Sequence, residues 1–143
     1  MKVFLDTNIL LDVLLERAGY EDAVALFQLQ DEGKLSLCVS LLTMVNVAYV
    51  YKKTVGQNTA VANVKYLSTL AEVLPMDETQ LQQALMMDGP DFEDNLQAAC
   101  ASACECEWLI TRNVKDYRIK RGLARKLSLP SIATPASFLA SFL

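Results

Sequence analysis

The sequence predicts an α/β fold, in which a mostly parallel central sheet of about five strands lies between two layers of helices. Short apolar segments rich in β-branched residues alternate along the chain with longer segments of helical spacing. Strands separated by helices favour right-handed crossovers, which place the strands parallel and the helices on both faces of the sheet. The 143 residues are 52% apolar, enough for one globular core, so a single domain is expected over residues 1–143.

The first half of the chain contains two predicted strands and their helices. Residues 2–6 form a strand that ends at Asp6, and helical spacing begins at Ile9. A second helix is expected over residues 20–32, closed by a glycine, and a strand over residues 35–39. Ser40 then serves as the N-cap of a long apolar helix that Gly56 interrupts.

The second half continues the alternation. A helix is predicted over residues 59–70 and a short strand over residues 72–75, after which Asp77 caps another helix with Gln80 in a capping box. Gly89 and Pro90 precede an alanine-rich helix over about residues 91–104. Strands follow at 108–111 and 131–134, separated by a basic stretch with no predicted element, and Pro135 starts the last helix.

Composition excludes several classes of site. The chain has no histidine, so Ser/His/Asp triads and His-ligated metal centres are ruled out. Its four cysteines lack a CxxC pair, which favours small buried side chains in a reducing cytoplasm over a zinc site. No apolar run reaches the ~20 residues that a bilayer requires, so we expect a cytoplasmic protein without a membrane segment.

Acidic residues are predicted to gather at one edge of the sheet. Ligands of such sheets bind outside the carboxyl ends of the strands. Asp6 ends the first strand, Asp94 lies near a helix start, and Asp116 follows the fourth strand. Each acid alone is better explained as a helix cap or a turn residue, and only their joint pattern favours a site. Carboxylates that converge suit hard cations such as Mg²⁺ or Mn²⁺, which need no histidine.

Several motifs, in order along the chain, resemble those of PIN-domain proteins. They are VFLDTN, SLLTMVNVAYVYKK, DFEDNLQAAC, LITRNVKDY and PASFL. The resemblance implies a Mg²⁺- or Mn²⁺-dependent ribonuclease fold, which is often the toxin half of a VapC-type toxin–antitoxin pair. It matches Asp6 to the family's first acid, Asp94 to its third, and Asn113 or Asp116 to the region of its fourth. The second acid, usually Glu, falls on Asn46, as in a subgroup that carries Asn there.

The resemblance and the expected topology together imply a residue set for the site. The catalytic set is Asp6, Asn46, Asp94 and Asp116, with Asp6, Asp94 and Asp116 as metal ligands. Substrate binding is assigned to Asn8, Thr111, Arg112, Asn113, Lys115 and Arg118; the Thr111 hydroxyl is also suited to orienting an acidic neighbour. Asp91 is either a partner of these acids or a helix cap, and Glu93 is interpreted as complementing the helix dipole.

The charge distribution points to RNA as the partner. The net charge is −4, yet residues 112–126 hold seven basic residues against one acid, a local charge of +6. This segment is suited to RNA phosphates, and Tyr117 to stacking on a base, although a basic run is also explained as a solvated surface. The expected function is an endoribonuclease acting on single-stranded RNA, with an antitoxin and a homodimer as further expected partners. The alternative is a catalytically weak or inactive PIN-fold module that binds RNA or protein, which the neutral Asn46 and Asn113 favour.

Overall fold

The computed structural model describes residues 1–143, and its five strands form one sheet in the order β3-β2-β1-β4-β5. Every neighbouring pair is parallel, so the predicted sheet is confirmed and is fully rather than mostly parallel. The strands are β1 (Lys2–Leu5), β2 (Ser36–Ser40), β3 (Glu72–Leu74), β4 (Trp108–Ile110) and β5 (Ser131–Ala133).

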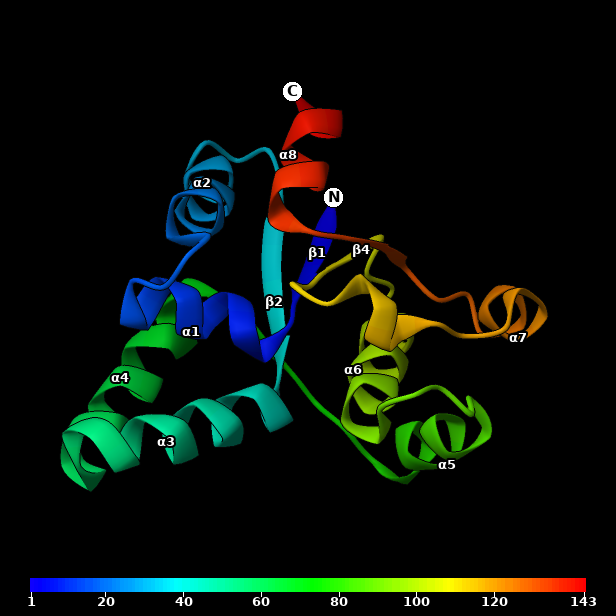
Figure 1. Ribbon diagram of the computed structural model, residues 1–143, viewed down its shortest axis with the longest axis horizontal. Helices are drawn as coiled ribbons and strands as arrows, with labels where there is room; N and C mark the ends of the chain where they lie inside the picture. Colours follow the sequence, from blue (N-terminus) through cyan, green and yellow to red (C-terminus); the bar gives the residue numbers. More distant parts are fainter.

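Helices occupy the connections between the strands. They are α1 (Thr7–Leu15), α2 (Tyr20–Asp31), α3 (Leu41–Val55), α4 (Gln57–Leu70), α5 (Glu78–Met86), α6 (Phe92–Ala103), α7 (Arg121–Lys126) and α8 (Pro135–Phe142), with a 3₁₀ helix, η1, at Val114–Tyr117. Figure 1 shows α1 to α4 on one side of the strands and α5 to α7 on the other. The predicted three-layer α/β/α arrangement is therefore confirmed.

The alternation of side chains along the strands creates two cores. Val3 and Leu5 of β1 pack in one core with α1, α2, α3 and α8, while Phe4 faces the other core with α6. In β2, Leu37 and Val39 pack in the first core and Cys38 in the second. Because successive side chains of a strand point to opposite faces, a sheet covered on both sides needs such continuous apolar runs.

Local signals set the helix boundaries where the sequence predicts them. The Ser40 hydroxyl accepts a hydrogen bond from the Thr43 amide at 3.0 Å and begins α3. Gly56, at φ 85°, separates α3 from α4, a conformation that glycine adopts without strain. Asp77 and Gln80 form the predicted capping box at the start of α5. These three predictions are confirmed.

Several element ends differ from the sequence-based expectation; β4 and β5, for example, each end one residue earlier. Asp6 does not belong to the first strand: it is the N-cap of α1, and its extended backbone hides the change from the periodicity. The basic stretch contains α7, a six-residue helix whose Arg and Lys side chains obscure any apolar period. No helix of the structure is both long enough and apolar enough to cross a bilayer.

Candidate active site

Asp6 lies at the junction of β1 and α1 with both carboxylate oxygens engaged. Its Oδ1 accepts a hydrogen bond from the Thr7 amide at 2.7 Å, and its Oδ2 accepts one from the Thr111 hydroxyl at 2.8 Å. Asp6 is 6% exposed, and this burial raises the pKa of its carboxyl. β1 and β4 are neighbours, which brings Thr111 to Asp6 although 105 residues separate them.

Thr111 orients Asp6 and has no access to a ligand. Its side chain is 1% exposed, and its hydroxyl donates to the Asp6 carboxylate. The expectation that Thr111 orients an acidic neighbour is confirmed. Its assignment as a substrate-binding residue is corrected, because a buried hydroxyl already committed to Asp6 cannot contact RNA.

The first turn of α6 brings three carboxylates to the same place. Asp91 is the N-cap, and its Oδ1 accepts a hydrogen bond from the Asp94 amide at 3.0 Å, so its role as a helix cap is confirmed. Burial, followed by the charges of Asp6, Asp91 and Asp116, raises the pKa of Asp94 to about 7. The like charges have no basic residue among them to offset this effect.

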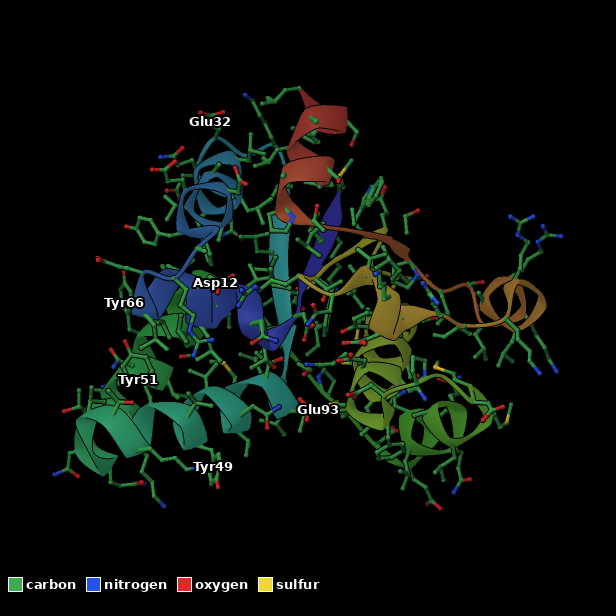
Figure 2. The ribbon with its side chains drawn as sticks, in the orientation of Figure 1. Asp12, Glu32, Tyr49, Tyr51, Tyr66 and Glu93 are labelled. Atoms are coloured by element: carbon green, nitrogen blue, oxygen red, sulfur yellow. The ribbon has the colours of Figure 1, made fainter.

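Glu93 reaches the site through Asn46. The Asn46 side-chain amide of α3 donates a hydrogen bond to Glu93 Oε1 at 2.6 Å. Figure 2 shows Glu93 between the start of α3 and α6. The interpretation of Glu93 as only a complement to the helix dipole was incomplete. Asn46 provides no charge of its own, but its hydrogen bond holds the Glu93 carboxylate of α6 beside α3, at the second acidic position of the family.

A buried polar network supports the floor of the site. Gln97 of α6 is fully buried: its Oε1 accepts a hydrogen bond from the Ser40 hydroxyl at 2.5 Å, and its Nε2 donates one to the Thr43 hydroxyl at 2.7 Å. The Thr7 and Thr43 hydroxyls are 3.1 Å apart. The network joins α6 to the starts of α1 and α3. Sequence reasoning missed it, since a single glutamine in a helix carries no distinguishing pattern.

The segment after β4 contributes an amide, an acid and basic groups. Asn113 and Asp116 face both the acidic cavity and a neighbouring cavity of about 470 Å³, which Arg112 and Lys115 also line. Arg112 donates a hydrogen bond to the buried Asp12 of α1 at 3.1 Å, which ties this segment to α1. Arg118 is exposed and lines neither of these two cavities.

Tyr117 differs from its expected role. It is 6% exposed, so it cannot stack on a base, and the expectation is wrong because η1 packs its ring into the core beside α6. Its hydroxyl is buried without a hydrogen-bond partner. Burial and the neighbouring charges of Asp6 and Asp94 raise the pKa of Tyr117. An unpartnered hydroxyl thus lies close to the acidic cluster.

The acidic and amide side chains of the site line one open cavity of about 410 Å³, which lies at the carboxyl ends of β1 and β4. Its wall contains five carboxylates and three amides, from Asp6, Asn8, Asn46, Asp91, Glu93, Asp94, Asn113 and Asp116. No three carboxylates converge as a closed ligand cage. Such a cavity suits a cation that keeps several of its own waters, as Mg²⁺ does. It offers no nucleophilic side chain paired with a base.

Comparisons with solved structures show the same fold in bacterial toxin–antitoxin complexes. VapBC2 of Rickettsia felis, bound to a DNA fragment of its promoter, is similar with a TM-score of 0.68 at 15% identity, over 94% of this chain and 98% of that one. DNA-bound VapBC of Salmonella typhimurium gives 0.68 at 19% identity with the same coverage. VapC20 of Mycobacterium tuberculosis, described as a sarcin–ricin loop cleaving toxin, gives 0.59 at 16% identity, over 87% of this chain and 94% of that one.

Two comparisons by sequence were informative: one with curated proteins, and one with a model of a protein family that covers most of the chain. No curated protein matches it. The sequence model of the PIN domain matches residues 2–115, a range that includes Asp6, Asn46, Asp94 and Asn113 and ends one residue before Asp116. With this match and the fold that the solved structures share, the chain belongs to the PIN domain family.

Proposed function

We propose that this protein is a metal-dependent endoribonuclease that hydrolyses phosphodiester bonds of single-stranded RNA. The observation that carries the proposal is the cavity in which Asp6, the acids of α6 and Asp116 meet. These carboxylates come from three separate parts of the chain, and helix capping accounts only for Asp6 and Asp91. Family membership supports the same chemistry.

The donor set fits a hard divalent cation. Carboxylate and amide oxygens are ligands that Mg²⁺ and Mn²⁺ prefer. Burial and then the neighbouring negative charges raise the pKa of Asp94, and a cation would relieve the second of these causes. Asp6, Asp94 and Asp116 are the proposed ligands, and Glu93 joins them through its contact with Asn46.

The chain's own residues bind and orient the substrate in this proposal. The Thr7 amide and Thr111 hydroxyl hold Asp6 in one orientation, so its charge needs no reorganisation during the reaction. The side-chain amides of Asn8 and Asn113 donate to phosphate oxygens, and Lys115 and Arg118 provide positive charge along the RNA backbone. A bound Mg²⁺ or Mn²⁺ would supply positive charge at the scissile phosphate and lower the pKa of a coordinated water.

An antitoxin is the proposed protein partner. The similar structures of Rickettsia felis and Salmonella typhimurium are VapBC complexes, which supports a role as the toxin of a toxin–antitoxin pair in the cytoplasm. A homodimer is compatible with this role. An adjacent reading frame that encodes a small DNA-binding protein, and its co-purification with this chain, would test the pairing.

A catalytically weak RNA- or protein-binding module is the second candidate function. The observation that favours it is Asn46, because an amide at the second acidic position removes one negative charge from the cation site. Glu93 restores a carboxylate there only through a hydrogen bond. The two candidates differ in whether the native chain cleaves RNA or only binds it.

The test is cleavage of a panel of single-stranded RNAs by the purified protein with Mn²⁺, followed on denaturing gels. We expect metal-dependent cleavage that a chelator stops. Asp94→Asn should lower the rate at least ~100-fold, the scale of losing a group that stabilises the transition state. Asp31→Asn, a matched change at the exposed end of α2, should leave the rate unchanged. If the native protein leaves every RNA of the panel intact while the Asn46→Glu variant cleaves RNA, the protein is the catalytically weak binding module.

A further inference from the structure

Two cysteine thiols far apart in sequence meet in the second core. Cys38 in the middle of β2 and Cys106, just before β4, have their Sγ atoms 3.4 Å apart. Both are free, and they are 0% and 5% exposed. This is near van der Waals contact between sulfurs, and neither residue belongs to the acidic cavity.

The backbone on either side holds the two thiols in place. Cys38 lies within β2, where it pairs with Phe4 on one side and Glu72 on the other. The Cys106 amide donates to the Ala101 carbonyl at 2.9 Å, and the next amide donates to the Lys2 carbonyl at 2.9 Å. Cys106 therefore lies in the short turn between α6 and β4, at the amino end of the sheet.

We propose that Cys38 and Cys106 form an oxidation site, at which a small peroxide converts the two thiols into an intramolecular disulfide. The Cys106 thiolate attacks a peroxide oxygen, and the oxygen–oxygen bond breaks to give a sulfenic acid and, after protonation, one water. The Cys38 sulfur then attacks the Cys106 sulfur, and the sulfenic oxygen leaves as a second water. The two sulfurs together lose two electrons, which the peroxide gains, and each thiol proton ends in water.

The surroundings assign the first step to Cys106. The contact with the Cys38 thiol lowers the pKa of Cys106, and the Lys2 ammonium acts in the same direction. The same contact raises the pKa of Cys38, so it remains the thiol that resolves the sulfenic acid. The burial of both thiols restricts the oxidant to a molecule as small as hydrogen peroxide.

The other two cysteines provide matched controls. Cys100 lies in α6 and Cys104 is the C-cap of this helix, and the Cys100 thiol donates to the Pro75 carbonyl at 3.6 Å. Cys104 is partly exposed, so it is the thiol that a peroxide reaches most easily from solution. A reaction governed by access alone would modify Cys104 first.

The disulfide would restrain the unfolded chain and leave the acidic site intact. It would join residues 68 positions apart, which removes many conformations from the unfolded state. Cys106 lies near Lys2 at the start of β1, whereas Asp6 follows the opposite end of this strand. Oxidation is therefore expected to change stability without changing the geometry of the cavity.

The test uses the full-length reduced protein, treated with hydrogen peroxide and then alkylated under denaturing conditions. We expect the loss of two of the four thiols, a Cys38–Cys106 link by tandem mass spectrometry, and a rise in Tm of about 5–10 °C that dithiothreitol reverses. Cys104→Ser should still form the link, and Cys106→Ser should not. Four remaining thiols, a link that involves Cys104, or a Cys106 sulfinic acid without a link would overturn the proposal. The position of the link in the oxidised wild-type protein, found by mass spectrometry, decides between these outcomes even if a variant fails to fold.

Discussion

At the scale of single residues, Asp94 connects function to stability. Its folded pKa of about 7 lies above the value of 3.8 for an ordinary Asp. The folded state therefore binds the Asp94 proton more tightly than the unfolded state does. As a result, the contribution of Asp94 to the free energy of unfolding falls as the pH rises from about 4 to 7, and ionised Asp94 destabilises the metal-free fold at neutral pH.

Asp94→Asn should remove this dependence. We expect the variant, in the presence of a chelator, to be more stable than the wild type at pH 8 by about 1 kcal/mol, after allowance for solvent screening, and no more stable at pH 4. Melting curves across this pH range measure the difference. Mn²⁺ should then raise the Tm of the wild type at pH 8 more than that of the variant. Parallel pH profiles for the two proteins would contradict the cause assigned to the pKa shift.

At the scale of elements, the buried Gln97 holds three helices in register. Its hydrogen bonds reach Thr43 at the start of α3 and Thr7 at the start of α1, so the side chains at the cavity floor depend on a residue that does not line it. A buried network of this kind specifies one arrangement, because every alternative leaves a polar group without a partner. The positions of Asp6 and Asn46 relative to α6 follow from it.

Gln97→Leu should destabilise the protein by roughly 2 kcal/mol, because the Ser40 and Thr43 hydroxyls would lose their shared partner. Urea unfolding followed by circular dichroism would measure the change. The matched variant Gln28→Leu, on the exposed face of α2, should change stability by less than about 0.5 kcal/mol. Equal stability of Gln97→Leu and wild type would show that packing alone sets the register of the helices.

At the scale of the whole molecule, two cores share one sheet. The core of β1 with α1 to α4 and α8, and the core with α6, use opposite faces of the same five strands. Neither face can be exposed without exposing apolar side chains of the shared strands. We therefore propose that residues 1–143 fold as a single domain.

A single domain should unfold in one cooperative step. We expect near-UV signals from Trp108, which packs against the first core, and far-UV signals from all helices to change together in urea. The slope of the transition should match the surface exposed by a chain of this length. Two separate midpoints would mean that the α5 to α7 side unfolds on its own and would contradict the proposal.

The sequence by itself determined the order and type of nearly every element. Strand and helix periods, the Ser40 cap and the Asp77 capping box are local features, and each depends on residues within one turn or one strand. The rule that parallel strands present ligands at their carboxyl ends was enough to place Asp6 and Asp116 at one cavity, and the resemblance to PIN-domain proteins added Asp94 at a helix start. The two elements that were missed, η1 and α7, lie in the basic stretch, where polar and basic residues leave no apolar period.

The tertiary structure alone decided which polar groups meet. Thr111 reaches Asp6 across 105 residues, Glu93 reaches Asn46 across 47, and Cys106 reaches Cys38 across 68. Such contacts depend on strand register and on the packing of helices against the sheet, which place side chains to within an ångström. A periodic pattern in the sequence records which face a residue occupies. It does not record the partner on the neighbouring element, because that partner is set by the geometry of two elements together.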